Sequence, residues 1–460
     1  MVRKEFILIA AAALCMAGCK ASSEAVAPAG GTDGAAAGTV SSAAPSSAGR
    51  LSARQQIAAN PYKAGGVYYL YEFEGIPEPT PAPEGYKPVY ISHYGRHGAR
   101  YLDSRTYIDG TVNILKRGHE CGQLTRFGES VYKRVLQHLD KAGSRLGDLS
   151  EIGWEQHQKI ARNMAAAYPE VVCPGTRVEA ISTVYPRCIL SMSSFCQSLT
   201  ACCPSLRLTA DTGLCYQDEL NAHRPENPSF RGVYPDDTKF TRIDDWGQYN
   251  MASFAARVVD YKGIIGRIFK DYEFVREWSE PSMFCFNLFS FVLNMQDAPS
   301  GVDLMDVFTP DDLYNLWRVD NFYFYNSYGP TRHQDVALLR HIVEHADEDL
   351  AGELPFVRLR FGHDTCVGAI LCMLNADGWA TVPEDAFHIE DTFQSWRITM
   401  AATIVMAFYR NDSGDTLVKF TLNERELSLP QLQSVSGPFY RWSDVRKYCI
   451  DYIGKYKLCK

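Results

Sequence analysis

Two arginines flank one histidine in an Arg-His-Gly-x-Arg segment of this 460-residue sequence, formed by Arg96, His97 and Arg100. A guanidinium group presents a rigid fork of N–H donors that matches the oxygens of phosphate. A neutral imidazole beside it could attack phosphorus as a nucleophile. Gly98 permits backbone angles and close approaches that other residues resist. The alternative is a basic surface turn that happens to contain a histidine, so the segment needs partners elsewhere in the sequence.

Three predicted strands, each followed by a turn and a helix, would position the candidate side chains. Apolar and β-branched residues predict buried strands over 88–92, 177–183 and 355–361. In open α/β folds, ligands bind beyond the carboxyl ends of parallel strands. We therefore expect the three turns to meet at one edge of a mainly parallel sheet.

The second and third turns carry further candidate residues. Arg187 follows the second strand at the start of a helix, and His363 and Asp364 follow the third. Three arginines and a second histidine would neutralise a phosphoryl group and the charge that develops as it is transferred. Asp364, if its surroundings keep it protonated, could give a proton to the leaving alcohol. These groups suffice for phosphomonoester hydrolysis without a metal or other cofactor. His93 could also hydrogen-bond at this edge.

Changes in composition along the chain predict its organisation. Residues 211–352 contain aromatic-rich, helix-like segments between turn-rich stretches. We predict an α/β protein whose three-layer core, a mainly parallel sheet flanked by helices, comprises residues 60–210 and 353–460. The segment 211–352 would form an inserted, mainly helical cap. Residues 60–87, rich in Tyr, Pro and Gly, are expected to run over the domain surface as an extended lead-in.

Two segments of similar form predict the starts of long amphipathic helices. Residues 122–128 and 147–153 each carry a hydroxyl residue, Thr125 or Ser150, that is a natural N-cap. Near the C-terminus, strand-like residues 401–422 predict a hairpin around a turn that contains Asn, Asp, Ser and Gly.

The N-terminus has the pattern of an exported lipoprotein. A basic start and a short apolar run precede Met16-Ala17-Gly18-Cys19, where small residues lead to a cysteine that could receive lipid. An ordinary signal peptide or a short membrane anchor are the alternatives, although the apolar run is too short to span a bilayer. We expect residues 1–18 to be a signal peptide, Cys19 to be lipidated and residues 19–59 to include a disordered linker. The protein would then be attached to the bacterial cell envelope, on its periplasmic or outer side, by the lipid alone.

The formal net charge of −8 argues against a nucleic-acid partner bound through bulk charge. A local cluster of arginines can still bind a small anionic phosphate ester. Of the 14 cysteines, Cys449 and Cys459 form a plausible disulfide pair. The sequence contains no Cys-x-x-Cys motif, so we do not expect a structural zinc site.

The candidate residues resemble the histidine acid phosphatase branch of the histidine phosphatase superfamily, which pairs Arg-His-Gly-x-Arg-x-Pro with a distal His-Asp or His-Ala-Glu motif. The resemblance covers most of residues 60–460, with Leu102 in place of the usual proline. It implies an α/β core with a helical cap and a phosphohistidine intermediate on His97. It also implies proton donation by Asp364 and phosphate binding by Arg96, Arg100, Arg187 and His363.

Within that branch, residues 100–104 look closest to bacterial multiple inositol polyphosphate phosphatases, whereas the His363–Thr365 segment is like that of periplasmic phytases and acid phosphatases. The resemblance therefore implies inositol polyphosphates (phytate-like esters) as substrates, with a broad-specificity acid phosphatase or a bisphosphoglycerate phosphatase as alternatives. Further cations for a polyphosphorylated substrate could come from Arg105, Lys116, Arg117, Lys239 and Arg242.

Two other classes of function remain open. His341, Glu344 and His345 match the His-x-x-Glu-His motif of inverted zinc peptidases, in which histidines four residues apart share one helix face. A lipid-anchored protein that binds phosphate esters without cleaving them is the second. Resistance of activity to a chelator would exclude the first class, and turnover would exclude the second.

Overall fold

A central eight-stranded sheet organises the computed structural model, which describes residues 51–221, 233–234, 245–246, 249–329 and 332–458. Four neighbouring strands run parallel, and an antiparallel hairpin extends the sheet on one side. This arrangement confirms the predicted mainly parallel α/β sheet. In spatial order the strands are β10 (Arg425–Glu426), β9 (Thr416–Leu422), β8 (Thr403–Arg410), β1 (Lys87–Arg96), β7 (Phe356–Gly362), β2 (Arg177–Ser182) and β3 (Arg207–Thr212), and β11 (Phe439–Arg441) pairs with β9.

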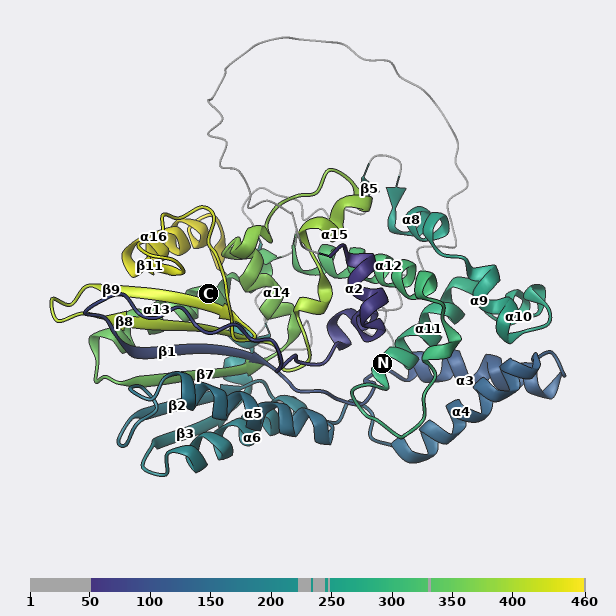
Figure 1. The fold of residues 1–460 in the computed structure, drawn as a ribbon, viewed down its shortest axis with the longest axis horizontal. Coiled ribbons are helices and arrows are strands. Elements are labelled where there is room, and N and C mark those ends of the chain that lie inside the picture. Colours follow the sequence, from purple (N-terminus) through teal and green to yellow (C-terminus); the bar gives the residue numbers. More distant parts are fainter. Residues whose placement is uncertain (1–50, 222–232, 235–244, 247–248, 330–331, 459–460) are drawn as a thin grey trace, which may run out of the picture.

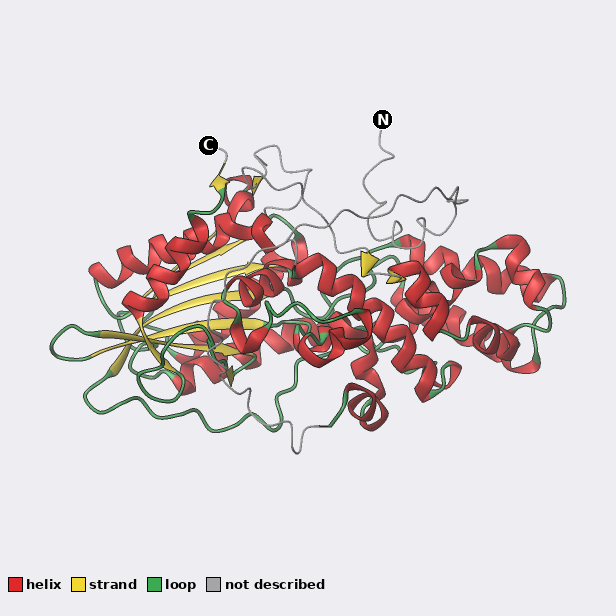
Figure 2. Cartoon of the chain, turned by 90° about the horizontal axis from the view of Figure 1, so that it is seen from above, coloured by secondary structure: helices red, strands yellow, loops and turns green. Residues whose placement is uncertain are grey.

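Helices cover both faces of the sheet, which completes the predicted three-layer core (Figures 1 and 2). Successive residues of β1 point to opposite faces. Ile91 packs with the layer that contains Phe195, and Tyr90 packs on Phe408, which in turn meets Trp442. The first layer is formed by α5 (Glu151–Ala167) and α6 (Pro186–Cys202), and the second by α13 (Val336–Ala351), α14 (Asp364–Met373) and α16 (Trp442–Ile453).

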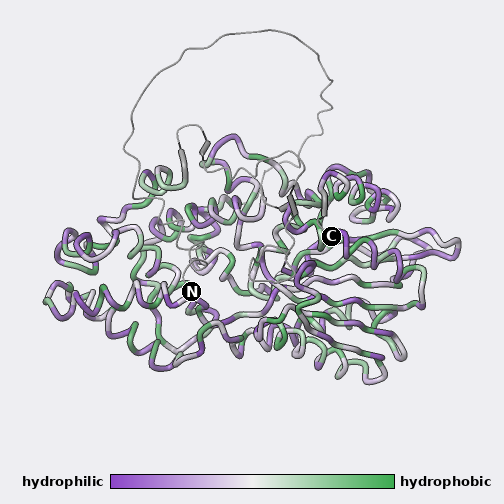
Figure 3. Tube along the Cα trace, turned by 180° about the vertical axis from the view of Figure 1, so that it is seen from behind, coloured by the Kyte–Doolittle hydropathy of each residue, from purple (hydrophilic) through white to green (hydrophobic). Residues whose placement is uncertain are grey.

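A helical lobe adjoins the core and occupies the right side of Figure 1. In Figure 3 hydrophobic and hydrophilic residues alternate along its helices, as expected for helices with one buried face. The lobe contains α3 (Arg105–Glu120), α4 (Arg126–Ala142), α8 (Met251–Val258), α9 (Tyr261–Ile268), α10 (Tyr272–Trp278), α11 (Pro281–Asn294) and α12 (Pro310–Tyr328). Shorter elements are α7 (Gln217–Leu220), α15 (Ile389–Thr392) and the strand pairs β4 (Val233–Tyr234) with β12 (Lys457–Leu458) and β5 (Asp245–Trp246) with β6 (Tyr249–Asn250).

Three helices pack across the predicted division between core and cap. Helices α3 and α4, expected in the core, pack on α11 and α9 of the lobe, whereas α13, expected in the cap, packs beside β1 and α16. An amphipathic sequence shows that a helix has a buried face but does not show which partner covers that face. Chain order alone therefore does not show which helices pack together, and the division into core and cap stays a prediction.

The N-terminal part of the described chain is more ordered than expected. Residues 53–59, placed in the linker by the sequence, form helix α2 (Ala53–Ala59), which packs on α12 with Ile57 buried. Ser52 and Gln55 form a capping box at its start, a signal that the sequence already contained. The next segment begins with the 3₁₀ helix η1 (Pro61–Tyr68), whose residues 64–67 are buried, rather than with an extended lead-in. Residues 72–86 contain no helix or strand and are partly or fully exposed, as expected for a surface lead-in.

The predicted helix starts are confirmed. Thr125 accepts a hydrogen bond from the backbone of Gly128, and Ser150 accepts one from the backbone of Gly153. No helix of the described residues has the length and apolar character needed to cross a bilayer. Cys449 forms no disulfide with another described cysteine, and its predicted partner Cys459 lies outside the described residues, as does Cys19.

Candidate active site

The Arg-His-Gly-x-Arg segment starts inside β1, which extends to Arg96 rather than ending at residue 92. The backbone N–H of His97 donates to the carbonyl of Gly362 at 3.0 Å, and the N–H of Ala401 donates to the carbonyl of His97 at 3.0 Å. His97 is thus held between the carboxyl end of β7 and the loop that precedes β8. Residues 97–100, which we call the His97 turn, leave the sheet at this point.

Helices α5 and α6 fix the backbone of the His97 turn. The N–H of Gly98 donates to Ser191 Oγ at 3.0 Å, and the N–H of Ala99 donates to Gln156 Oε1 at 2.9 Å. The hydroxyl of Ser150, the N-cap of α5, donates to the carbonyl of Ala99 at 3.0 Å. The turn is therefore buried without losing its backbone hydrogen bonds, and its position is set by two helix starts.

The His97 side chain has its tautomer fixed by the backbone. Nδ1 lies 2.9 Å from the carbonyl oxygen of Gly98, and because a carbonyl can only accept, Nδ1 carries the proton. The lone pair is then on Nε2. Burial, followed by the positive charges of Arg187, Arg96 and Arg100, holds the pKa of His97 well below its usual value. The imidazole is consequently neutral and nucleophilic over a wide range of pH.

Arg96 is buried and anchored by main-chain carbonyls. One terminal nitrogen donates to the carbonyls of Val67, Ile398 and Thr399, the last two at 3.1 Å. The other terminal nitrogen lies 3.7 Å from Asp364 Oδ2. The carbonyls orient the guanidinium group without neutralising it, so most of its positive charge is retained for an anion.

Arg100 points into the same region from the end of the His97 turn. Its Nη2 pairs with Asp103 Oδ2 at 2.9 Å, and its Nη1 donates to the carbonyl of Tyr101 at 3.1 Å. The guanidinium carbon lies 5.5 Å from the centroid of the Tyr68 ring, a cation–π distance. Asp103 and Tyr68 therefore define the orientation of Arg100.

His363 and Arg187 complete the group around His97. The rings of His97 and His363 are 5.8 Å apart between centroids. Tyr185 presents its ring to both: the His363 ring meets it edge-on at 5.0 Å, and the Arg187 guanidinium carbon lies 5.0 Å from its centroid. The backbone N–H of His363 donates to the hydroxyl of Tyr94 at 3.1 Å, which ties the end of β7 to β1.

Asp364 is the first residue of α14, and its side chain is partly exposed. The hydroxyl of Tyr328, the last residue of α12, donates to Asp364 Oδ2 at 2.7 Å. Burial alone would raise the pKa of Asp364, but Arg96, the Tyr328 hydrogen bond, His363 and Arg100 together hold that pKa below its usual value. These neighbours favour the ionised carboxylate, so the protonation that proton donation by Asp364 requires depends on what else is bound at the site.

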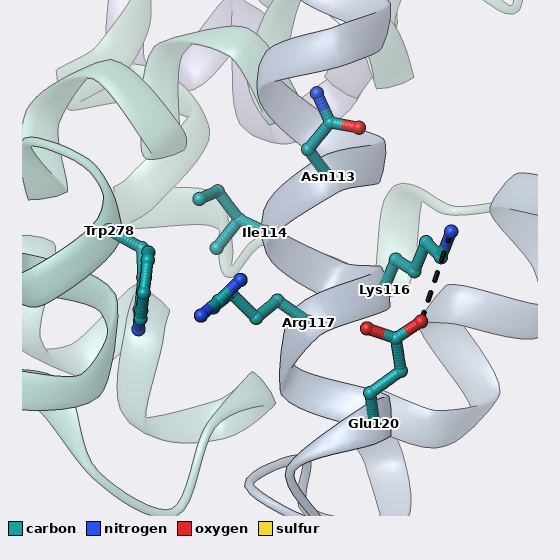
Figure 4. Close-up of a pocket in the computed structure, with 6 residues that line it drawn as sticks. All are labelled: Asn113, Ile114, Lys116, Arg117, Glu120 and Trp278. Carbon is teal, nitrogen blue, oxygen red and sulfur yellow. Dashed lines mark ion pairs between the residues drawn. The ribbon is translucent and has the colours of Figure 1, made fainter.

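The three turns meet as predicted, and they bring together Arg96, His97, Arg100, Arg187, His363 and Asp364. The further cationic residues suggested for a polyphosphorylated substrate do not all lie near this group. Lys116 and Arg117 line a surface pocket of about 320 Å³ between α3 and α10, where Arg117 lies 3.2 Å from the centroid of the Trp278 ring (Figure 4). At a rise of about 1.5 Å per residue, Lys116 is about 17 Å along α3 from Arg105. Arg105 itself pairs with Asp109, and Lys239 and Arg242 lie outside the described residues.

His93 does not reach the site. Its ring lies on the α6 side of the sheet, 5.2 Å from the centroid of Phe195 and 5.1 Å from that of Phe361. Burial, followed by the charges of His157 and Arg360, lowers the pKa of His93 to about 3. The side chain is a neutral component of the core.

Several residues at the site were not found from the sequence: Tyr68, Tyr185, Tyr328, Gln156 and Ser191. The two glycines that precede Tyr68 in the sequence could have pointed to this segment, because glycine is typical of places where the backbone packs closely. In the structure a Cβ on Gly66 would lie only 2.8 Å from Ser395 Oγ. Tyr328 comes from the helical lobe, and no local motif identifies it.

The zinc-peptidase motif is engaged in other interactions. Arg360 Nε donates to His341 Nδ1 at 3.0 Å, while Glu344 pairs with Arg340. His345 Nδ1 lies 3.0 Å from Glu348. Among the described residues, no group of three His, Cys, Asp or Glu side chains could hold a metal ion. These contacts do not favour the peptidase alternative.

Comparisons with known proteins agree with the site. None of the curated proteins matches the chain. The solved multiple inositol polyphosphate phosphatase of Bifidobacterium longum, in complex with inositol hexasulfate, is similar over 84% of this chain and 97% of its own, with a TM-score of 0.65 and 15% identity. The D. castellii phytase is similar over 85% of each chain (TM-score 0.59, 15% identity), and the Hafnia alvei phytase over 81% of this chain and 98% of its own (0.55, 11%).

At these identities the likeness establishes a shared fold. The family model of the histidine phosphatase superfamily, branch 2, matches residues 95–423, a span that begins one residue before Arg96 and includes Asp364. The chain belongs to branch 2 of the histidine phosphatase superfamily and is a phosphomonoester hydrolase.

Proposed function

We propose that this phosphatase acts through a covalent phosphohistidine on His97, with inositol polyphosphates as its substrates. One observation carries the mechanism: a buried imidazole has its Nδ1 proton fixed on the Gly98 carbonyl, and three arginines lie near enough to lower its pKa. Nε2 would attack phosphorus as the bond to the leaving oxygen breaks. Arg96, Arg100, Arg187 and His363 would bind the phosphoryl oxygens and stabilise their developing charge.

The leaving oxygen needs a proton, and Asp364 is the acid beside Arg96. Positive neighbours hold the free carboxyl ionised, but a bound phosphoryl dianion would neutralise those neighbours and allow Asp364 to take up a proton. Asp364 would then protonate the leaving alcohol. In the second step water would lose a proton to Asp364 and attack the phosphohistidine, which releases phosphate and restores His97.

The choice of inositol polyphosphates rests on two arguments. The sequence at residues 100–104 looks like that of bacterial multiple inositol polyphosphate phosphatases, and the solved B. longum enzyme with this fold binds inositol hexasulfate. Phosphate release from phytate, bisphosphoglycerate, a sugar phosphate and an aryl phosphate would rank the substrates. A preference for the aryl phosphate or bisphosphoglycerate would contradict the assignment.

Replacement of His97 by alanine tests the mechanism. The His97→Ala protein should fold, as judged by circular dichroism, but lack turnover. The wild-type enzyme, quenched during turnover, should carry an acid-labile phosphate that is absent from the variant. Substantial turnover by folded His97→Ala would exclude His97 as the nucleophile.

We also propose that the protein is exported and attached to the cell envelope through lipid on Cys19, with residues 1–18 removed. A single lipid beside a folded domain gives membrane contact without a spanning helix. The substrate would then be a small extracytoplasmic phosphate ester.

A further inference from the structure

A second carboxylate lies near the candidate active site, on the same helix as Tyr328. Asp320 precedes Tyr328 by eight residues of α12, which is about 12 Å of helix rise and about 80° around the helix axis, so the two lie on the same half of the helix surface. That side faces the site, because Tyr328 hydrogen-bonds to Asp364 at 2.7 Å. Asp320 is too far along the helix to act on the same phosphoryl group as Asp364.

The surroundings of Asp320 place it near Tyr68, the residue whose ring contacts Arg100. A Cβ on Gly66 would lie 3.1 Å from Asp320 Oδ2, and Tyr68, two residues later, lies against the Arg100 guanidinium. Burial raises the pKa of Tyr107 of α3, and the nearby groups Tyr68, Asp103, Tyr323 and Asp320 raise it further. These side chains therefore gather in one cluster beyond Arg100.

The Asp320 carboxyl has no hydrogen bond or ion pair with any side chain or backbone group in the described part of the chain. Its side chain is only partly buried, so the carboxyl remains reachable. Burial raises the pKa of Asp320 to about 8, so the group is neutral at pH 7 and carries a donor proton. A neutral carboxyl can donate a strong hydrogen bond to an anionic oxygen, whereas an ionised carboxylate would repel it.

We propose that Asp320 is a specificity-determining residue that donates a hydrogen bond from its protonated carboxyl to a second, distal phosphate of a polyphosphorylated substrate. This inference rests on the proposed function, since it takes the reacting phosphate to be bound at His97. Loss of the proton from Asp320 would weaken the binding of polyanions and leave that of a single tetrahedral anion unchanged.

The titratable and charged groups around Asp320 come from four elements. Asp320 acts electrostatically on Tyr68 of η1 and Tyr107 of α3, and Asp103 of the loop after β1 acts on the same two tyrosines. Arg100 acts on Tyr68 and Tyr323 of α12 acts on Tyr107, while the neutral Ser395 of η7 (Ser395–Arg397) lies, like Asp320, against Gly66. Burial raises the pKa of Tyr68 and Tyr107 far above that of Asp320, so neither tyrosine titrates in the same range.

The test compares two anions whose sulfate groups do not titrate between pH 6 and pH 9.5. Calorimetry would give the Kd of myo-inositol hexasulfate and of inorganic sulfate for the full mature chain across this range. Sulfate fills only the phosphoryl site, so the ratio of the two Kd values cancels titration of that site. We expect the hexasulfate Kd to rise about 10-fold or more relative to the sulfate Kd as Asp320 ionises.

Two variants make the result specific. Asp320→Asn keeps the shape of the side chain and should abolish this rise. Asp311→Asn, at the other end of α12 where Asp311 pairs with Arg54 on the surface, should keep it. A flat ratio in the wild-type protein, or the same rise in Asp320→Asn, would overturn the proposal. Neither sulfate ligand is turned over, so this binding test does not depend on the phosphohistidine mechanism. A failure of that mechanism would be seen separately, as the absence of acid-labile phosphate from enzyme quenched during turnover.

Discussion

Gly98 and Gly153 pack backbone against backbone, one directly after His97 and the other in the first turn of α5. A Cβ on Gly98 would lie 2.4 Å from the carbonyl oxygen of Gly153, and a Cβ on Gly153 would lie 2.2 Å from the carbonyl oxygen of Ala99. This approach allows Ser150 and the rest of the α5 N-terminus to hold the His97 turn. The position of the candidate nucleophile therefore depends on the start of a helix more than 50 residues later in the chain.

Gly153→Ala should displace the His97 turn. Overpacking of this kind typically costs about 1–3 kcal/mol of stability, and a small displacement of the imidazole should lower kcat/KM at least about 10-fold. Thermal unfolding and phosphate release measure the two effects. Gly266→Ala is the matched control, because Gly266 lies inside α9 with no heavy atom within 4 Å of its would-be Cβ. It should leave activity unchanged and, if anything, stabilise the helix. Equal behaviour of both variants would contradict the positioning role of Gly153.

The His97 imidazole should stay neutral in acid. Burial and three arginines lower its pKa, so the reactive neutral form persists well below pH 6.5. A histidine of ordinary pKa would be about 97% protonated at pH 5. NMR of ¹³C-labelled histidine, with His97 assigned from the His97→Ala spectrum, should show a neutral ring at pH 5. In Arg187→Gln the loss of one positive charge should raise the pKa. A resonance that titrates near 6.5 in the wild type would contradict the geometry.

Asp364→Asn separates leaving-group chemistry from phosphate binding. An inositol or glycerol alkoxide leaves poorly without a proton, whereas nitrophenolate leaves with little assistance. General acid catalysis typically contributes about 10²–10⁴-fold. The variant should therefore slow hydrolysis of inositol and glycerol phosphates far more than that of nitrophenyl phosphate.

Arg187→Ala provides the contrast for this experiment. It should slow the hydrolysis of both kinds of substrate, because in the proposed mechanism Arg187 binds the phosphoryl group and not the leaving oxygen. Equal losses on both substrates for Asp364→Asn, under conditions in which breakdown of the phosphohistidine does not limit the rate, would assign the proton to another group.

Cys19→Ser tests the attachment to the envelope. If Cys19 receives lipid, the variant should leave the membrane fraction or remain unprocessed, and metabolic labelling with a fatty acid should fail. Cys121→Ser, which changes an exposed cysteine of the folded domain, should fractionate like the wild type. A Cys19→Ser protein that migrates and fractionates normally would disprove lipid attachment.

The sequence determined the elements and the candidate residues. Period-2 and period-3.6 patterns report which residues of a segment are buried, so the strands around 88–92, 177–183 and 355–361 and the helix caps at Thr125 and Ser150 could be predicted from local chemistry. The residue types of the Arg-His-Gly-x-Arg and His-Asp segments, together with the expected topology of parallel strands, were enough to predict that six side chains meet at one edge of the sheet.

Only the tertiary structure decided how those six side chains are tuned. The carbonyls that orient Arg96 and the Tyr328 hydroxyl on Asp364 come from segments far apart in the chain. The His97 Nδ1 contact is to the neighbouring Gly98 carbonyl, but α5 and α6 hold the turn in which it forms. The pKa of Asp364 is lowered because Arg96, the Tyr328 hydrogen bond, His363 and Arg100 together outweigh burial, and no local pattern encodes that balance. The same holds for α3, α4 and α13: amphipathicity gave each a buried face, and packing across the whole chain chose the surface that covers it.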